Sequence, residues 1–408
     1  MVARGSKGST TLAIKNPVPI SILFINPLPS SMGGIDAILP ELIHGLDKKR
    51  YQVIVALPKQ GDYVDRYRDA GAKVVFVEFN TIQRKRKLIA TLYSLARLGP
   101  SVFRLYEIIR NHNVKIVHTQ KINTLDGDIA ARLAGVKAVH SIHEQPATPM
   151  FVWKLMAKLV YLIADRIIVT CDETFRKIPE LSARRPKVNK VYNGITIPPL
   201  ISLNDAARRD VLGNSIVGEA QIVGMVARLA PNKGQTTFLH AAPKVLAKFP
   251  DTQFVVVGDI TSETSWEIEY REYLHRLAEH SGANGAIHFL GKRLDIYPIL
   301  QALDIFVHPA TSDILPTVVI QAMAVGKPIV VTSVGGLPEL INHDFTGIVV
   351  PPVKPVALAE AIMWILKNPK KSREMGVSAQ KIAYSKFSRE TYVENTERIY
   401  RELIDSST

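Results

Sequence analysis

Short apolar runs alternate with helical stretches along almost the whole chain, and this alternation restricts the fold more than any other feature of the sequence. The runs are bounded by turn residues and are apolar throughout, which is typical of strands buried on both faces. Strands that alternate with helices form parallel sheets wound on both faces, so the sequence predicts an α/β fold. The predicted strands cover residues 21–25, 52–56, 73–77, 115–118, 138–142 and 166–170, then 221–226, 254–258, 287–291 and 329–331.

The alternation starts again near residue 220, which indicates two domains. A chain of 408 residues is long enough for two domains of ordinary size. Pro198 and Pro199, with the polar residues that follow them, mark the linker. We expect a loose leader over residues 1–17, a first domain over residues 18–197, a second domain over residues 198–386 and a last helix over residues 387–405.

Positive charge is concentrated in the first domain. The chain carries 51 Lys and Arg against 37 Asp and Glu, a net charge of +14, and its first 200 residues hold 30 of the basic residues against 15 of the acidic ones. This distribution suits an anionic acceptor, an anionic membrane surface or nucleic acid, and it also suits a solvated basic face without a partner. We do not expect nucleic acid as a partner, because no known nucleic-acid-binding module or interleaved aromatic pattern accompanies the charge.

One basic cluster, Arg-Lys-Arg-Lys at residues 84–87, precedes a helix predicted over residues 88–111. In one interpretation, this cluster forms an edge of the molecule that lies on anionic phospholipid. In the other, it is the exposed start of an ordinary helix. Both stay open on the sequence alone.

The single cysteine, Cys171, excludes an internal disulfide and is compatible with a reducing cytosol. No apolar run reaches the roughly 18 residues that cross a bilayer. We expect a cytoplasmic protein, peripheral at the inner face of the membrane where anionic lipid binds the first domain. The charged residues that interrupt the longest apolar candidate are Lys154, Lys158, Asp165 and Arg166.

The segment 308–347 holds the strongest candidate site. It predicts a strand end, a loop with Asp313, a helix from Pro316 to about Val325, and a left-handed cap at Gly326. The helix start at Pro316, Thr317 and Val318, with the positive end of the helix dipole, predicts a site for a phosphate group. Asp313 precedes that site and Gln321 lies about two turns into the helix, so both are expected to face one ligand, one meeting a sugar and the other a nucleotide.

Two other turns join a strand to a helix. Gly33 and Gly34 follow the first predicted strand and are expected to aim backbone amides at an anion. Arg228 and Lys233 follow the strand over residues 221–226 and precede a helix, so they place two cations beside a helix start. His143 ends the strand over residues 138–142, at the edge where parallel sheets bind ligands.

These motifs resemble the donor site of glycosyltransferase family 4, which has the GT-B fold of two facing, doubly wound Rossmann-like domains. In that family a Glu, seven residues and a second Glu followed by Ala-Met-Ala lead into a Gly-x-Pro strand. This chain keeps the frame but has Asp313 at the first Glu and Gln321 at the second. Ile314 also stands where Gly or Pro is usual.

The resemblance implies roles for the candidate residues. Asp313 would bind hydroxyls of the donor sugar, Gln321 the ribose, and His143 the sugar from across the cleft. The diphosphate would meet Arg228 and Lys233, and the last helix would pack back on the first domain. The implied donor-binding residues are Gly33, Gly34, Lys292 beside the base, Pro316, Thr317, Val318 and Gln321.

The resemblance implies a retaining, metal-independent hexosyltransferase without a cofactor. It would move a sugar from a UDP- or GDP-linked donor to a glycan, lipid-linked or small-molecule acceptor, in cell-envelope or polysaccharide synthesis. The second domain would hold the nucleotide sugar and the first domain most of the acceptor. The alternative is a non-catalytic relative that binds nucleotide sugar, favoured by the changes at Asp313 and Gln321, and a GT-B epimerase or phosphorylase also stays open. The lack of Walker and Gly-x-Gly-x-x-Gly motifs argues against an ATPase or a dehydrogenase.

Overall fold

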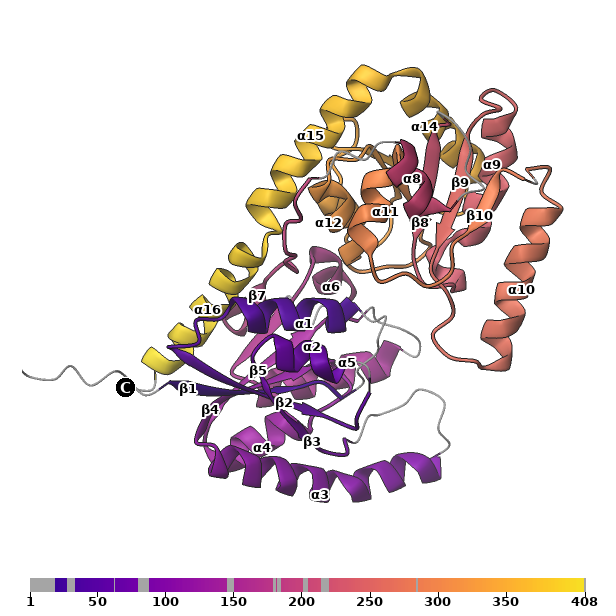
Figure 1. Cartoon of the computed structure of the whole chain (residues 1–408). Helices are drawn as coiled ribbons and strands as arrows, with labels where there is room; N and C mark the ends of the chain where they lie inside the picture. Colours follow the sequence, from indigo (N-terminus) through magenta and orange to yellow (C-terminus); the bar gives the residue numbers. More distant parts are fainter. Residues whose placement is uncertain are drawn as a thin grey trace, which may run out of the picture.

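The computed structural model describes residues 19–27, 34–61, 63–79, 88–144, 150–178, 181, 185–200, 205–213, 220–283 and 285–406. It contains two parallel sheets, each covered by helices on both faces, in two domains that share one boundary (Figure 1). The predicted α/β fold with two doubly wound domains is confirmed. Within these residues no helix is both long enough and apolar enough to span a bilayer.

The sheet of the first domain has the order β3-β2-β1-β4-β5-β6-β7, and every neighbouring pair is parallel. The order changes direction between β1 and β4, because β2 and β3 extend to one side of β1 and the later strands extend to the other. Its strands are β1 (Ile20–Ile25), β2 (Tyr51–Leu57), β3 (Lys73–Phe76), β4 (Val114–Gln120), β5 (Lys137–Ile142), β6 (Arg166–Val169) and β7 (Val188–Lys190).

Two helical layers cover this sheet. Apolar side chains of α1, α2 and the last helix, α16, form one core with the sheet, while α3, α4 and α5 form the cores on the opposite face. The short helix α6 follows β6 at the domain boundary. The helices are α1 (Gly34–Gly45), α2 (Val64–Asp69), α3 (Leu88–Asn111), α4 (Asp126–Ala134), α5 (Met150–Ile163), α6 (Asp172–Lys177) and α16 (Arg389–Asp405).

The second domain repeats the plan with the strand order β10-β9-β8-β11-β12-β13, again all parallel. Here the order changes direction between β8 and β11. The strands are β8 (Ile222–Val226), β9 (Gln253–Val257), β10 (Ile287–Phe289), β11 (Ile305–His308), β12 (Ile329–Thr332) and β13 (Ile348–Val350). The helices are α8 (Asp205–Leu212), α9 (Gln235–Leu246), α10 (Ser265–Glu279), α11 (Ile296–Ala302), α12 (Thr317–Ala324), α13 (Leu337–Leu340), α14 (Pro355–Lys367) and α15 (Pro369–Lys386).

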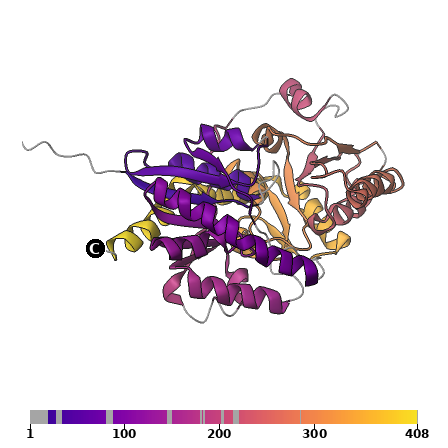
Figure 2. The ribbon, with the colours of Figure 1, turned by 90° about the horizontal axis from the view of Figure 1, so that it is seen from below.

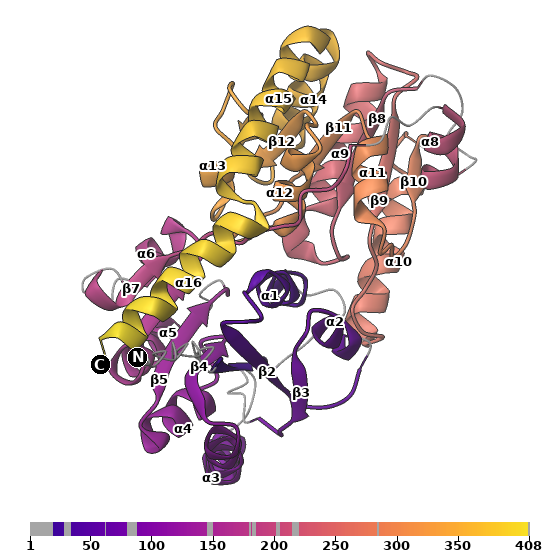
Figure 3. The ribbon, with the colours of Figure 1, turned by 60° about the vertical axis from the view of Figure 1, so that its left-hand side comes forward.

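The chain crosses between the domains twice, and the two crossings lie side by side. The amide of Ile195 donates to the carbonyl of Phe387 at 2.9 Å, and the amide of Arg389 donates to the carbonyl of Ile195 at 2.8 Å. Beyond this point α16 lies along the first domain (Figure 3), where the hydroxyl of Tyr400 is 2.7 Å from Nδ1 of His118. The last helix therefore belongs to the core of the first domain although it follows the second in sequence.

Candidate active site

The carboxyl ends of the strands in the two sheets meet at the domain boundary. Cys171 lies just beyond β6, and Gly336 lies just beyond β12. A Cβ added at Gly336 would come within 3.1 Å of the side chain of Cys171. Doubly wound sheets bind ligands at this edge, where the strand order changes direction. The ends of β1 and β4 in the first domain, and of β8 and β11 in the second, are therefore the parts of the boundary to search for a site.

Three side chains form a polar cluster after β8 and β11. Oδ2 of Asp313 accepts hydrogen bonds from Nζ of Lys233 at 2.6 Å and from Nε2 of His308 at 2.9 Å. Its second oxygen, Oδ1, accepts the amide of Ile314 at 3.1 Å. Asp313 and Lys233 are 14% and 16% exposed, so water screens their attraction only in part. The structure thus brings together Asp313 and Lys233, which were predicted to meet different groups of one ligand.

The charges of this cluster follow from burial and from its hydrogen bonds. Burial alone raises the pKa of Asp313, but the charge of Lys233 and the hydrogen bond from His308 outweigh it and hold that pKa well below its usual range. Burial lowers the pKa of His308, although the carboxylate opposes the shift. A neutral His308 that donates from Nε2 has an unprotonated Nδ1, and this atom is buried without a partner among the described residues. His308, the last residue of β11, therefore orients the Asp313 carboxylate.

Glycine lets the Asp313 loop rest directly on another backbone segment. Gly335 has φ +56°, and a Cβ there would come within 1.6 Å of the carbonyl oxygen of Asp313. The amide of Gly336 donates to the carbonyl of Ile314 at 2.6 Å. The turn after β12 thus sets the position of the Asp313 carboxylate.

The helix after the Asp313 loop, α12, presents free amides at its start. It begins at Thr317, with Pro316 in the preceding cap position, and ends at Ala324, one residue before the predicted end at Val325. Pro316 has no N–H, so of the three predicted phosphate contacts only Thr317 and Val318 can donate from the backbone. Amides in the first turn of a helix have no acceptor within that helix. Gly326 has φ +71°, as predicted for a left-handed cap.

Tyr297 connects Gln321 to the linker between the domains. The side chain of Gln321 is hydrogen bonded to the hydroxyl of Tyr297, and that hydroxyl donates to the carbonyl of Thr196 at 2.7 Å. Because the hydroxyl proton is used on Thr196, the amide of Gln321 is the donor to Tyr297. Burial raises the pKa of Tyr297 to about 12, so the phenol is protonated at neutral pH. Sequence reasoning missed Tyr297, since an isolated Tyr at a helix start carries no signal.

The two remaining basic candidates of the second domain lie on the surface. Arg228 is exposed just after β8, where its carbonyl accepts Nε2 of Gln235 at 2.8 Å. Among the ion pairs of the described residues, none involves Arg228. Lys292 is exposed in the turn between β10 and α11. Arg228 and Lys233 share the end of β8, but only Lys233 contacts Asp313.

His143 of the first domain is held in a neutral form. Its Nε2 lies 2.8 Å from Oε1 of Gln120, at the adjacent end of β4. Burial, and then the charges of Lys121 and His140, lower the pKa of His143 to about 4. With Nε2 donating to the amide oxygen of Gln120, Nδ1 is an acceptor, and it is buried without a partner in the described part of the chain. This acceptor fits a hydroxyl group as its donor.

Two charged residues beside His143 were not found from the sequence. Lys121 follows β4 and has φ +79°, a left-handed backbone conformation that is unusual for residues other than Gly or Asn. Burial lowers its pKa, opposed by the charges of Glu144 and Asp36, and burial raises the pKa of Glu144, opposed by Lys121. Strain and burial at the ends of β4 and β5 are typical of a functional position. The available signal was a charged residue within two positions of the end of each strand.

Several predicted features lie outside the described residues or carry no contact to the site. Gly33 and the basic cluster at residues 84–87 fall outside the described residues. Gly34 is the first residue of α1 and is exposed, with no atom within 4 Å of a Cβ added there. The described residues contain no group of three His, Cys, Asp or Glu side chains placed to hold a metal ion.

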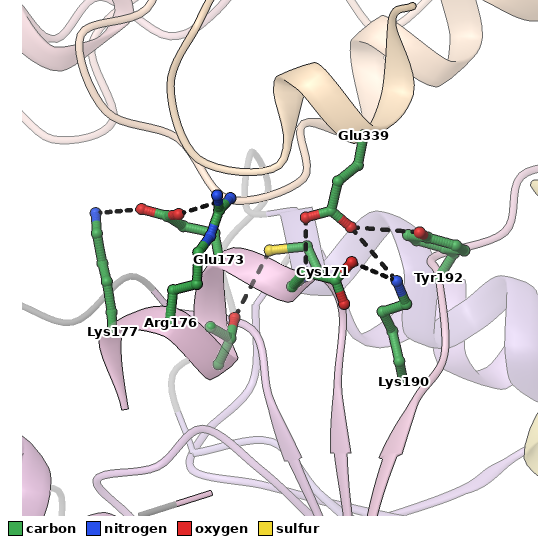
Figure 4. A network of polar contacts seen from close by, with 9 residues as sticks. Cys171, Glu173, Arg176, Lys177, Lys190, Tyr192 and Glu339 are labelled. Atoms are coloured by element: carbon green, nitrogen blue, oxygen red, sulfur yellow. Dashed lines mark hydrogen bonds and ion pairs between the residues drawn. The ribbon is translucent and has the colours of Figure 1, made fainter. Parts of the chain in front are cut away.

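A polar network joins the domains beside this site (Figure 4). Glu339 of α13 accepts the amide of Asp172 at 2.8 Å and the hydroxyl of Tyr192 at 3.3 Å. Nζ of Lys190 lies 3.7 Å from the same carboxylate and 2.8 Å from that of Asp172. One carboxylate of the second domain therefore contacts three residues of the first domain, and it lies three positions after Gly336.

Two family models match the chain, one over each domain. The model described as Glycosyltransferase Family 4 matches residues 32–197, and the model described as Glycosyl transferases group 1 matches residues 212–382. The first match contains His143, and the second contains the whole polar cluster around Asp313.

Two curated relatives resemble the chain over most of its length. The UDP-Gal:alpha-D-GlcNAc-diphosphoundecaprenol alpha-1,3-galactosyltransferase of Escherichia coli is 26% identical over 345 residues, which cover 81% of this chain and 84% of that enzyme. The N,N'-diacetylbacillosaminyl-diphospho-undecaprenol alpha-1,3-N-acetylgalactosaminyltransferase of Campylobacter jejuni is 26% identical over 350 residues, which cover 81% of this chain and 85% of that enzyme.

Solved structures agree with the fold. HepE of Anabaena, in complex with UDP and glucose, superposes with a TM-score of 0.77 at 22% identity and covers 94% of this chain and 99% of its own. Sucrose-phosphate synthase of Thermosynechococcus elongatus superposes with a TM-score of 0.76 at 20% identity and covers 95% and 100%. With both domains matched in sequence and the two facing sheets matched in structure, the chain belongs to glycosyltransferase family 4 and is a glycosyltransferase of the GT-B fold.

Proposed function

We propose that this glycosyltransferase moves a hexose from a UDP- or GDP-linked donor to a lipid-linked or glycan acceptor, with retention at the anomeric carbon and without a metal ion. The observation that carries the proposal is the Asp313–Lys233–His308 cluster, which lies beside the start of α12 where the second sheet changes direction. The names of the relatives support the substrate classes, because the E. coli enzyme uses UDP-Gal and a diphosphoundecaprenol acceptor.

The leaving diphosphate would be stabilised by cations and backbone amides. Lys233 has three N–H donors, so its ammonium keeps the bond to Asp313 at 2.6 Å while another N–H reaches a phosphate oxygen. Arg228 is exposed beside it, and Thr317 and Val318 supply amides at the positive end of α12. These groups would take up the negative charge that grows as the glycosidic bond breaks, the role that a metal ion has in other transferases.

The donor sugar would lie between Asp313 and His143. Asp313 is ionised and accepts three hydrogen bonds, which leaves acceptor capacity for a sugar hydroxyl. Its side chain is one methylene shorter than Glu, so the sugar would sit closer to the loop or bind through a water molecule. His143 would accept a second hydroxyl at Nδ1. The acceptor would enter from the first domain and attack on the face from which the diphosphate leaves.

The proposed donor is tested with nucleotide release. The purified protein is incubated with UDP-, GDP- and ADP-sugars, with and without a membrane extract and with and without EDTA. We expect nucleotide release that depends on the extract and survives EDTA. This release should fall at least about a hundredfold in Arg228→Ala and in Lys233→Ala. Lys244, an exposed cation on α9 of the same domain, provides the control, since Lys244→Ala should keep wild-type release.

A non-catalytic binder is the second candidate, favoured by the contact of Gln321 with Tyr297, which bonds to the linker. In this reading Gln321 and Tyr297 tie the donor helix to Thr196 instead of presenting a carboxylate to ribose. Such a protein would bind a nucleotide sugar tightly and release no nucleotide with any donor in the panel. That result would overturn the transferase proposal.

A further inference from the structure

The outer face of α5 carries an apolar stripe. Phe151, Leu155 and Leu162 are 70%, 55% and 62% exposed. Their spacing of four and seven residues places them on one side of the helix. Three large apolar side chains in line on one exposed helix face are unusual for a surface that meets only water.

The exposed stripe is not the side of α5 that packs on the core of the first domain. The opposite side of α5 carries Met156, Ala157 and Val160, which are buried at 5%, 0% and 0% exposure. They pack with strands β5 and β6 in the first domain. The helix thus already has its inner partner, and the stripe is a second apolar face that points away from the sheet.

The helices next to α5 continue this outer layer. α4 contacts both α3 and α5, and all three cover the same face of the first sheet (Figure 2). Leu133 on α4 is 66% exposed, and Phe103 on α3 is 62% exposed. Exposed apolar side chains therefore occur on each helix of the layer.

The charged residues beside the stripe indicate which kind of surface it would bind. Lys154 and Lys158 are exposed on the same side of α5 as the three apolar residues, and the helix contains no Asp or Glu. Apolar side chains flanked by lysines match a surface with an apolar interior and anionic headgroups. The basic excess of the first domain has the same sign, with 30 basic against 15 acidic residues in the first 200.

We propose that the exposed stripe of α5, formed by Phe151, Leu155 and Leu162 and flanked by Lys154 and Lys158, docks this protein on an anionic phospholipid bilayer. The proposal rests on the proposed function in one respect, the lipid-linked acceptor. α5 starts at Met150, six residues after Glu144 and seven after His143. Docking through α5 would therefore place the acceptor side of the active site close to the membrane surface.

Vesicle binding tests the proposal without donor or acceptor, so that a failure of transfer leaves the test intact. The full chain is sedimented with vesicles of phosphatidylglycerol and phosphatidylcholine, and with vesicles of phosphatidylcholine alone. We expect binding to the anionic vesicles only. Lys154→Gln and Lys158→Gln should each lower the affinity about fivefold, and the triple change of Phe151, Leu155 and Leu162 to Ser should lower it at least about tenfold.

Matched variants separate this surface from general charge and hydrophobicity. Trp266, 54% exposed on α10, and Lys370 and Lys371, exposed on α15, lie in the second domain. Trp266→Ser and the pair Lys370→Gln and Lys371→Gln should leave vesicle affinity within about twofold of the wild type. Circular dichroism and thermal unfolding confirm that each variant is folded.

Three outcomes would overturn the proposal. In the first, the protein binds no anionic vesicle. In the second, the α5 variants bind as the wild type does, whereas neutralising residues 84–87 abolishes binding. In the third, the stripe mediates self-association, so that the wild type is a dimer without affinity for vesicles and the triple Ser variant is a monomer.

Discussion

At the scale of single residues, the candidate site depends on the carboxylate of Asp313, which is bound by two neighbouring side chains. One oxygen of Asp313 accepts hydrogen bonds from both Lys233 and His308, and these two residues together outweigh the effect of burial and lower the pKa of the carboxyl. The ion pair of Asp313 and Lys233 is therefore both a part of the fold and a part of the proposed donor site. Removing one of these two side chains leaves the charge of the other largely buried and uncompensated.

The depressed pKa of Asp313 predicts a pH-dependent contribution to stability. Its pKa is about 3.9 in an unfolded chain and well below that in the fold. The ionised carboxylate thus stabilises the fold above about pH 5, and this stabilisation is lost as the pH falls below about 4. In Lys233→Met we expect most of this pH-dependent stabilisation to vanish. Urea unfolding at pH 3 to 7 measures the effect: the difference in unfolding free energy between wild type and variant should shrink on acidification. A difference that stays constant with pH would contradict the prediction.

The contact of Gln321 with Tyr297 predicts that the lost family glutamate cannot simply be restored. Tyr297 has one hydroxyl proton and gives it to the carbonyl of Thr196. A Glu at position 321 has no donor at neutral pH and would compete with Thr196 for that proton. We expect Gln321→Glu to destabilise the fold by about 1 kcal/mol, and to do so much less when Tyr297→Phe is already present. A double-mutant cycle by urea unfolding measures this coupling. Additive effects would show that the two side chains act independently.

At the scale of elements, the Asp313 loop is shaped by the turn after β12. Gly335 combines a left-handed backbone with a close approach to the loop, and Gly336 adds a hydrogen bond to Ile314. The loop carries the carboxylate, and α12 directly after it carries the amides. A shift of this turn would therefore disturb two parts of the proposed donor site together.

Gly335→Ala is expected to weaken nucleotide binding strongly. The new Cβ would lie 1.6 Å from the carbonyl oxygen of Asp313, so the loop must move. Gly282 provides the control, because it also has a positive φ, +78°, but nothing lies within 4 Å of its Cβ position. Both variants should lose about 1 kcal/mol from the backbone conformation. Only Gly335→Ala should also raise the Kd for UDP or GDP, by about tenfold or more, in calorimetric titrations. Equal affinities of the two variants would count against the proposed position of the diphosphate.

At the scale of the whole molecule, two sets of contacts connect the domains. In the first set, the crossings at Ile195 and Phe387 pair backbone to backbone, and Arg389 and Thr196 both contact the carboxylate of Glu41 on α1. In the second set, Glu339 joins the second domain to Asp172, Lys190 and Tyr192 (Figure 4). The first set includes the covalent chain, whereas the second depends on one carboxylate.

Glu339→Ala is expected to loosen the arrangement of the domains without unfolding either of them. It removes the acceptor of the Asp172 amide and the Tyr192 hydroxyl. We expect a larger radius of gyration in X-ray scattering and a KM for donor raised about threefold to tenfold, because binding must then also order the domains. Glu360, exposed on α14, supplies the control Glu360→Ala. Unchanged scattering and unchanged KM would show that the network does not hold the domains together.

The sequence by itself determined the two α/β domains and most of the candidate positions. Strand and helix periodicities are local, and so are the turns and loops after strands that hold Arg228, Asp313 and His143. Only the tertiary structure decided which of these residues meet. Lys233 and Asp313 are 80 residues apart, and their contact exists because β8 and β11 are neighbours in the sheet. The roles of Tyr297 and Lys121 likewise depend on domain packing and on one left-handed backbone conformation, which no local pattern of residue types specifies.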